Sequence, residues 1–104
     1  MKKSQCYRAC LSNHRITFIP TESYLEVIKD AYDNTYNIHF HKVGDEWSAT
    51  EESTGARCVP GTYRTKALCR EKVLECSCVY KKLLSTKSMI EAAEKLKEYK
   101  ESLI

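Results

Sequence analysis

Two histidines one residue apart, His39 and His41, are the first positions in this sequence whose residue type and spacing could support chemistry. Alternate residues of an extended strand point to the same side, so the two imidazoles would share one face of a sheet. Pairs of this kind contribute to some zinc sites, where imidazole nitrogens are the ligands. The competing interpretation is a polar sheet face that carries two histidines and holds no metal.

The cysteines are a second source of ligands or cross-links. They are Cys6, Cys10, Cys58, Cys69, Cys76 and Cys78. Cys6, Cys10 and His14 would align on one face if their segment were helical, whereas Cys76 and Cys78 would point about 200° apart on a helix. No pair has the Cys-x2-Cys spacing of structural zinc sites, and the first residues do not read as the signal peptide of a secreted, disulfide-rich domain. We therefore expect six free thiols, no metal and no cofactor.

No catalytic constellation is recognisable in the sequence. No cysteine lies in a nucleophile elbow or a Gly-rich loop, and the carboxylates fall in turns and on exposed helix faces rather than in an acid/base pair. The only glycines are Gly44, Gly55 and Gly61, which cannot make a phosphate-binding loop. We therefore expect a protein that is not an enzyme.

Length and composition predict one folded domain over residues 1–104. Hydrophobic residues make up 42% of the chain, with seven Tyr, two Phe and one Trp, which argues against disorder. The net charge of +3 is too small to indicate nucleic acid by itself, although the first twenty residues hold basic side chains and no acidic one. No apolar run approaches the ~18 residues that span a bilayer. We expect a cytoplasmic protein with no membrane partner.

Three short antiparallel strands are predicted between residues 36 and 60. The first begins at Tyr36 and alternates apolar with polar side chains, which is the period of a half-buried strand. Trp47 belongs to a second strand with the same alternation, and a brief third strand covers residues 57–59. Turns rich in Gly, Asp and Ser separate the strands, and Pro60 ends the third.

Three helices are predicted around this sheet. A capping box that starts at Ser23 predicts a helix near residues 21–33. Residues 66–84 form a long central helix whose apolar stripe is wider than a surface helix needs. A C-terminal helix follows a second capping box at Ser88. The predicted fold class is α+β: a small three-stranded antiparallel sheet packed on a long helix, with an N-terminal helix, a C-terminal helix, and Trp47 in the interface.

The C-terminal helix carries an apolar seam that must be buried. Its members are Met89, Ala92, Leu96, Tyr99 and Leu103, spaced as in two heptads of a coiled coil. Two heptads are too short to be stable alone, so the seam must dock on the central helix as an antiparallel pair or on a second copy of the chain. The central helix also has more apolar surface than the sheet can cover. We therefore expect a homodimer through the C-terminal helices.

The polar side of the predicted sheet is expected to face solvent. It carries Asn37, His39, His41, Ser48, Thr50 and Arg57. The sequence around it contains Trp47-Ser-Ala-Thr, Thr54-Gly55-x-Arg57 and Gly61-Thr-Tyr63-x-Thr65-Lys66-x-Leu68. Over residues 36–80 this pattern resembles the AP2-like and integrase arm-binding domains, which bind DNA through such a sheet. The resemblance implies DNA contacts from His39, His41, Arg57, Arg64 and Lys66.

A second resemblance rests on size and composition rather than on a motif. A short, Lys/Glu-rich single domain without catalytic motifs resembles the small accessory proteins of phages and mobile elements, which include anti-CRISPR and antirestriction inhibitors. We therefore expect a non-enzymatic protein that binds a host protein or nucleoprotein complex, with a DNA-binding module and a small zinc-binding protein as alternatives. A protein partner would contact aromatic anchors such as Tyr63 or Tyr80. The expected nucleic-acid or partner-binding residues are His39, His41, Arg57, Tyr63, Arg64 and Lys66.

Overall fold

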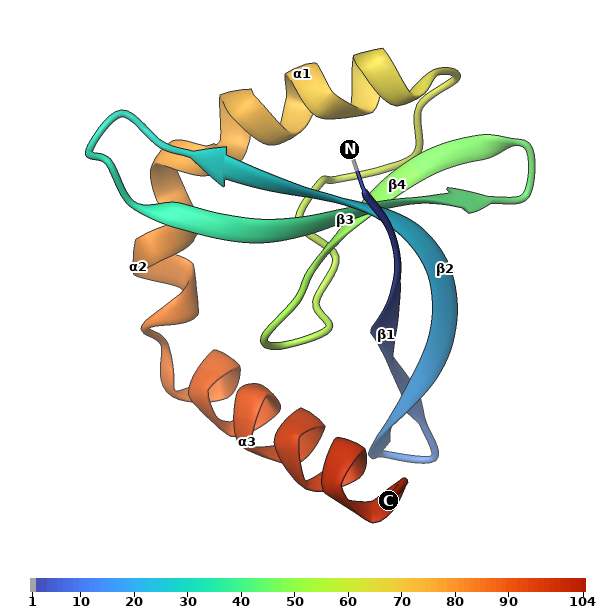
Figure 1. Cartoon of the computed structure of the whole chain (residues 1–104). Coiled ribbons are helices and arrows are strands. Elements are labelled where there is room, and N and C mark those ends of the chain that lie inside the picture. Colours follow the sequence, from blue (N-terminus) through green and yellow to red (C-terminus); the bar gives the residue numbers. More distant parts are fainter. Residues whose placement is uncertain (1) are drawn as a thin grey trace.

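Four strands and a C-terminal group of helices make up the computed structural model, which describes residues 2–104 (Figure 1). The strands are β1 (Lys2–Ser12), β2 (Arg15–Lys29), β3 (Thr35–Val43) and β4 (Glu46–Glu51), paired antiparallel in the order β1-β2-β3-β4. The helices are α1 (Lys66–Cys76), a short 3-10 helix (Ser77–Val79), α2 (Tyr80–Leu84) and α3 (Lys87–Ser102). None of the helices in residues 2–104 is long and apolar enough to cross a membrane. The chain is α+β, but the predicted three-stranded sheet with an N-terminal helix is wrong.

Residues 21–33, predicted to be helical, lie mostly in β2. The expected N-cap, Ser23, is 2% exposed and lies within the sheet. Glu26, the expected partner in the capping box, instead pairs with Arg70 of α1 at 2.7 Å. The same residues suit a strand, because their side chains alternate between the side toward α1 and the side away from it. Pairing with β1 and β3 therefore overrides the local helical signal.

The long β1–β2 hairpin accounts for the N-terminal segment. Its two-residue turn is Asn13-His14, with φ angles of 50° and 64°, the left-handed conformation that matches the twist of a hairpin. The helical alignment considered for Cys6, Cys10 and His14 does not occur, because Cys6 is buried in β1, Cys10 is exposed and His14 lies in the turn. Within residues 2–104, no three His, Cys, Asp or Glu side chains are gathered so that they could hold a metal ion.

The face of the sheet toward α1 carries the hydrophobic core. Its buried members are Ile28, Tyr36, Ile38, Phe40, Ala49, Val59, Cys69, Val73 and Tyr80. The predicted packing of this face on the helix is confirmed, since Cys69 and Val73 of α1 are fully covered. Trp47 packs at the edge of this core, half-buried, with Lys42 Nζ 5.2 Å and the Tyr24 ring 6.1 Å from its ring centroid.

Truncating Trp47 tests how much this edge contributes. Because the ring is half-buried, we expect Trp47→Ala to lower the free energy of unfolding by about 2 kcal/mol, less than the ~3–5 kcal/mol typical of a fully buried aromatic residue. The backbone hydrogen bonds between Trp47 and Tyr63, 2.7 and 2.8 Å long, do not depend on the ring. Urea unfolding measures the difference, with Tyr32→Ala as the control because Tyr32 is 78% exposed. An unchanged urea midpoint for Trp47→Ala would place the ring outside the core.

The predicted central helix, residues 66–84, is interrupted at Ser77. The Ser77 hydroxyl donates a hydrogen bond of 2.7 Å to the Leu74 carbonyl oxygen, and such bonding back to the preceding turn bends helices. A 3-10 helix follows, and α2 leaves in a new direction (Figure 1). The cap of the next helix lies two residues before the expected one: the Thr86 side chain, rather than that of Ser88, accepts the capping hydrogen bond of α3.

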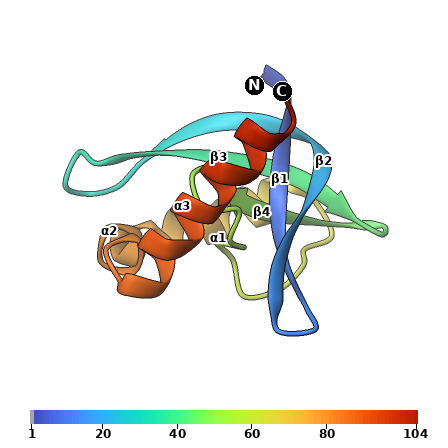
Figure 2. The same cartoon turned by 90° about the horizontal axis from the view of Figure 1, so that it is seen from below.

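The middle of the apolar seam of α3 is buried on the side of the β1–β2 hairpin rather than against α1, whereas Leu103 at its end is 55% exposed. Ala92 and Leu96 are 8% and 1% exposed, and the Tyr99 ring lies 5.6 Å from that of Tyr7 and 5.3 Å from that of Phe18. The helix runs across the underside of the sheet, on the side away from α1, toward β1 and β2 (Figure 1, Figure 2). The predicted antiparallel helix pair is therefore wrong, because the N-terminal hairpin supplies the apolar surface.

The homodimer prediction was based on the seam of the C-terminal helix and on the apolar surface of the central helix, and only the second observation still applies. Ala92 and Leu96 of the α3 seam are covered within the chain, but the α1–α2 segment still has apolar side chains that are 40–51% exposed: Leu68, Leu74, Val79 and Leu83. A dimer through this segment should give, by light scattering, twice the 12.0 kDa mass of one chain. Leu83→Glu should then convert it to a monomer, whereas Leu96→Glu should unfold the chain. A wild-type mass of one chain at tens of micromolar would contradict the dimer.

Candidate functional site

The face of the sheet that points away from α1 is polar and nevertheless buried. Its buried residues are Ser23, His39, His41, Ser48 and Thr50, each at most 2% exposed. Of the residues expected there, only Asn37 and Arg57 are exposed. The expectation that this face lies in solvent is therefore wrong. The bent β1–β2 hairpin and the segment that follows β4, residues 52–57, lie on this side of the sheet (Figure 1).

Gly55 holds the 52–57 segment against β1. Its carbonyl oxygen accepts a hydrogen bond of 2.8 Å from the Ala9 backbone N–H. Its φ is +72°, and a β-carbon at this position would lie 2.5 Å from the Tyr7 carbonyl oxygen. Only glycine fits, because a side chain would meet rigid backbone in a conformation that L-residues avoid. This close approach closes one side of the polar face.

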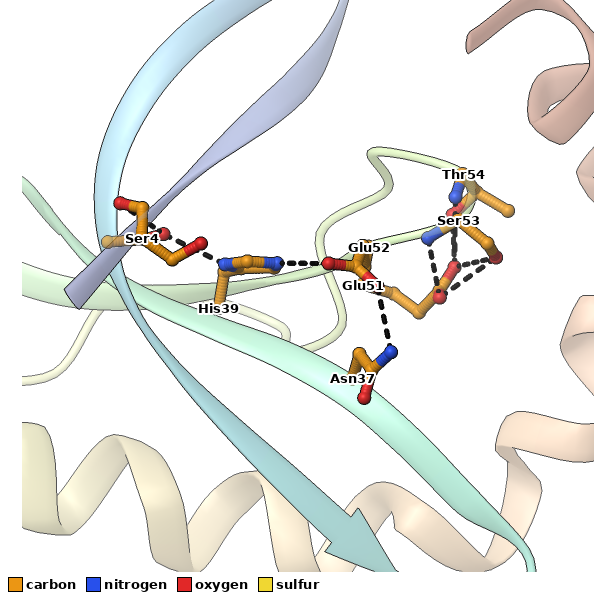
Figure 3. A network of polar contacts seen from close by, with 8 residues as sticks. Ser4, Asn37, His39, Glu51, Glu52, Ser53 and Thr54 are labelled. Atoms are coloured by element: carbon orange, nitrogen blue, oxygen red, sulfur yellow. Dashed lines mark hydrogen bonds and ion pairs between the residues drawn. The ribbon is translucent and has the colours of Figure 1, made fainter. Parts of the chain in front are cut away.

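Glu51 fixes the turn that leads into the same segment. Its carboxylate accepts hydrogen bonds of 2.8–3.0 Å from the backbone N–H and the hydroxyl of both Ser53 and Thr54 (Figure 3). The Thr54 hydroxyl oxygen in turn accepts a hydrogen bond of 3.1 Å from the Ala56 N–H. Glu51 is 7% exposed, and a carboxylate buried to this degree needs such donors to offset its lost hydration.

A chain of hydrogen bonds crosses the polar face. The Ser23 hydroxyl lies 2.9 Å from Nδ1 of His39, and Nε2 of His39 lies 3.1 Å from a carboxylate oxygen of Glu52. Glu52 also accepts a hydrogen bond of 2.8 Å from the Asn37 side-chain amide (Figure 3). Burial alone would raise the pKa of Glu52, but the hydrogen bonds from His39 and Asn37 outweigh it and hold this pKa below its usual value.

The order serine, histidine, carboxylate is also that of hydrolase triads, but the contacts here favour a structural role. Ser23 is 2% exposed, and its hydroxyl also lies 3.3 Å from the Ser4 carbonyl oxygen of β1. A triad serine needs a hydroxyl that is free to attack a substrate carbonyl, whereas the Ser23 hydroxyl is engaged by both the His39 ring and the backbone of β1. We interpret this series of hydrogen bonds as a structural connection between β1, β2, β3 and the segment after β4.

A pocket of about 330 Å³ lies between β1, the ends of β3 and β4, and the 52–57 segment. It is lined by Arg8, Ala9, His41, Val43, Ser48, Thr50, Gly55 and Arg57. In the part of the chain that the structure describes, two guanidinium groups line this pocket and no carboxylate does. The Ser48 hydroxyl, in a residue 1% exposed, is the one buried side-chain polar group of residues 2–104 that lacks a hydrogen-bond partner. Because buried hydroxyls are normally paired, Ser48 is the residue of this lining whose hydrogen-bonding capacity is still unused.

The two arginines can both donate to a ligand. Arg8 is half-buried, and its Nε donates a hydrogen bond of 2.9 Å to the Thr21 hydroxyl, which positions the guanidinium and leaves its terminal nitrogens open. Arg57 is exposed and its backbone bridges to that of Thr50. Within residues 2–104, neither arginine forms an ion pair. The pocket therefore carries two uncompensated positive charges.

His41 separates this pocket from the hydrogen-bond chain. Its Nε2 lies 2.8 Å from the Thr50 hydroxyl and its Nδ1 lies 3.3 Å from the Lys42 carbonyl oxygen. Burial lowers the pKa of His41 below its ordinary value of 6.5, and the hydrogen bond to the Lys42 carbonyl only partly opposes this. The nearby Arg8 guanidinium lowers the pKa further, and the neighbouring His39 ring acts in the same direction. The ring is therefore neutral at neutral pH, and the Thr50 hydroxyl donates to Nε2.

This lowered pKa predicts a loss of stability in mild acid. The unfolded chain takes up a proton on His41 near pH 6.5, whereas the folded protein resists protonation until the pH is lower. The contribution to stability is fully present above pH 6.5 and declines as the pH falls below that value. Urea midpoints measured from about pH 7.5 to 5.5 should therefore fall for the wild type, and fall less for His41→Gln, which cannot titrate. Parallel curves for the two proteins would show that His41 is not responsible.

The structure brings together two of the six residues expected to form the site. His41 and Arg57 line the pocket, and His39 lies behind it in the hydrogen-bond chain. The other three, Tyr63, Arg64 and Lys66, lie in the connection to α1 and at its first residue. There, Tyr63 pairs its backbone with Trp47, and Lys66 Nζ lies 5.2 Å from the Tyr24 ring centroid, on the α1 side of the sheet.

The expected set omits Arg8, Ser48 and Thr50, which the structure places in the pocket. The alternation of β4 was a usable signal for Ser48 and Thr50, since it puts them on the same face as His41 through the pairing of β3 with β4. No comparable signal exists for Arg8, because its strand joins the site through the β1–β2 pairing and the contact with Gly55.

Tyr80, expected as an exposed anchor for a protein partner, belongs to the core. It is 5% exposed, and its hydroxyl donates a hydrogen bond of 2.6 Å to the Cys58 carbonyl oxygen. Burial, reinforced by the neighbouring Cys58, raises the pKa of Tyr80 above its usual value. The ring packs edge-on against Tyr36, with 5.5 Å between centroids.

Comparison with protein-family models, with curated proteins and with solved structures finds no match to this chain. The resemblance to AP2-like and integrase arm-binding domains therefore stays a prediction. The function has to be inferred from the geometry of the pocket.

Proposed function

We propose that this chain is a non-enzymatic binding protein that holds an anionic group of its partner in the polar pocket. The observation that carries the proposal is Ser48, which is 1% exposed and lines a pocket with two arginines. Within residues 2–104 its hydroxyl has no hydrogen-bond partner and neither arginine forms an ion pair. The partner is a host protein or nucleoprotein complex, as expected of a small accessory protein of a phage or mobile element.

A single anion could bind the Ser48 hydroxyl and the guanidinium groups of Arg8 and Arg57 at once. A buried donor without an acceptor costs about 1–3 kcal/mol, and an oxygen placed against Ser48 would remove that cost. The same anion could accept charge-assisted hydrogen bonds from Arg8 and Arg57, which are the stronger kind. This role requires no bond to be made or broken, which is why we propose binding rather than catalysis.

Binding of DNA by laying the sheet in a groove has less support. That mode needs His39 and His41 at the surface, and they are 0% and 2% exposed. Phosphate contacts from an exposed basic face would also be needed, whereas the two arginines of the pocket converge on one small space. We therefore do not extend the proposal to this mode.

Affinity capture from a bacterial lysate tests the proposal. The immobilised wild type should retain a partner that Arg57→Gln loses, because Arg57 is exposed and its loss removes charge without disturbing the fold. Arg15→Gln is the matched control, since Arg15 is an exposed arginine outside the pocket. Nuclease treatment separates a protein partner from a nucleoprotein complex. A partner retained equally by Arg57→Gln would contradict a role for the pocket.

A further inference from the structure

The donors of the pocket come from several directions. Arg8 lies on β1, Ser48 and Thr50 lie on β4, and Arg57 follows the turn after β4. A planar carboxylate is matched by a single guanidinium fork. A tetrahedral oxyanion presents oxygens in three dimensions and suits donors that surround it. The arrangement of these donors therefore favours a tetrahedral group.

The charge of the pocket also favours a tetrahedral oxyanion over a carboxylate. Two arginines line it without a neighbouring carboxylate, and His41 is the other ionisable group in the lining. A phosphate monoester carries about −1.5 to −2 charges at pH 7 and three strong acceptor oxygens. Such a group would neutralise both guanidiniums, whereas one carboxylate would leave a positive charge uncompensated.

The depth of Ser48 limits how the ligand can enter. Because Ser48 is 1% exposed and its hydroxyl oxygen is covered, a ligand can reach this hydroxyl only when it is inserted into the pocket and the lining shifts slightly around it. A terminal phosphate can enter end-on with three free oxygens. A phosphodiester has two free oxygens and continues on both sides, so a chain would have to bend into the pocket. The geometry favours the terminal group.

We infer that the pocket is a binding site for a terminal phosphate monoester, held by Arg8 and Arg57 with Ser48 donating to one of its oxygens. This inference rests on the proposed function and names the chemical class of the anion. The phosphate could belong to a phosphorylated side chain or to a nucleotide, since both present the same group.

Nuclear magnetic resonance titration of the arginine Nε–H signals tests the inference. Inorganic phosphate at about pH 7.5, where its second proton is mostly lost, should shift the Arg8 and Arg57 signals saturably. Acetate at equal ionic strength should bind at least tenfold more weakly. Arg57→Gln should weaken phosphate binding by at least tenfold and Ser48→Ala by about fivefold, and Arg15→Gln should stay within twofold of the wild type.

The outcomes distinguish the phosphate inference from the proposed anion-binding function. Acetate binding as tightly as phosphate would overturn the phosphate inference and leave the proposed anion site intact. No saturable shift with either anion would overturn both. Equal phosphate affinity in the wild type and Ser48→Ala would also overturn the inference, because the buried hydroxyl would then not contact the ligand.

A second set of titrations tests the end-on entry. O-phosphoserine and adenosine monophosphate should each bind at least as tightly as inorganic phosphate, and dimethyl phosphate should bind at least tenfold more weakly. The tighter of the two monoesters identifies the source of the phosphate. Dimethyl phosphate binding as tightly as the monoesters would contradict a site for a terminal group.

Discussion

Replacing Gly55 by alanine should lower the free energy of unfolding by about 3 kcal/mol, because two costs add at this position. The new β-carbon would lie 2.5 Å from the Tyr7 carbonyl oxygen and 3.1 Å from the Ala9 nitrogen. Neither is the end of a flexible side chain, so the 52–57 segment has to move away from β1. The positive φ of +72° adds strain of its own. Urea unfolding measures the loss.

Gly44→Ala is the matched control for this prediction. Gly44 has a similar φ of +63°, but no atom lies within 4 Å of the place where its β-carbon would be. We expect this variant to lose only about 1 kcal/mol, the cost of a positive φ alone. Equal losses in the two variants would mean that the contact of Gly55 with β1 contributes nothing.

Replacing Glu51 by glutamine should also lower the free energy of unfolding by about 3 kcal/mol. The carboxylate accepts hydrogen bonds from both the backbone and the hydroxyl of Ser53 and of Thr54. An amide keeps one acceptor oxygen and turns two N–H donors toward groups that are themselves donors. Because Thr54 is 2% exposed, its unpaired groups could not turn to water instead.

Glu71→Gln is the control for Glu51→Gln. Glu71 is an exposed residue of α1, and no hydrogen bond or ion pair of its side chain is present within residues 2–104. Its replacement should change the free energy of unfolding by less than about 0.5 kcal/mol. A loss at Glu51 as small as that at Glu71 would show that the turn does not depend on the carboxylate.

The elements that were predicted correctly are those whose signal is local. The alternation that starts at Tyr36 gives β3, Trp47 lies in β4, and Gly44 sits in the turn between them with a φ of +63°. The apolar stripe that begins at residue 66 gives α1, although this helix ends at Cys76 rather than at residue 84. Each pattern is complete within about a dozen residues and needs no distant partner.

Residues 21–33 were misassigned because their sequence fits two structures. The spacing of Ser23 and Glu26 matches a helix start, whereas the β-branched and aromatic residues Tyr24, Val27 and Ile28 suit a strand. Pairing decides between them: Ser23 lies opposite Ser4, and Glu26 lies opposite Ile38. These partners are distant in sequence, so local reasoning could not choose the strand.

Only part of the site could be predicted from the sequence, for a related reason. Strand alternation places His41, Ser48 and Thr50 on one face, but a polar face normally implies solvent. This face is instead covered through tertiary contacts between segments distant in sequence, among them the approach of Gly55 to β1. Arg8 joins the site through that same approach.

Thermal unfolding in sodium sulfate and in sodium chloride of equal ionic strength tests the anion pocket most directly. An anion that binds the folded state raises its stability, whereas the general effect of sulfate acts on any folded protein. The comparison therefore needs the wild type and a double variant, Arg8→Gln with Arg57→Gln. We predict that sulfate raises the melting temperature of the wild type by roughly 5 °C more than that of the double variant. An equal rise in both proteins would contradict an anion site in this pocket.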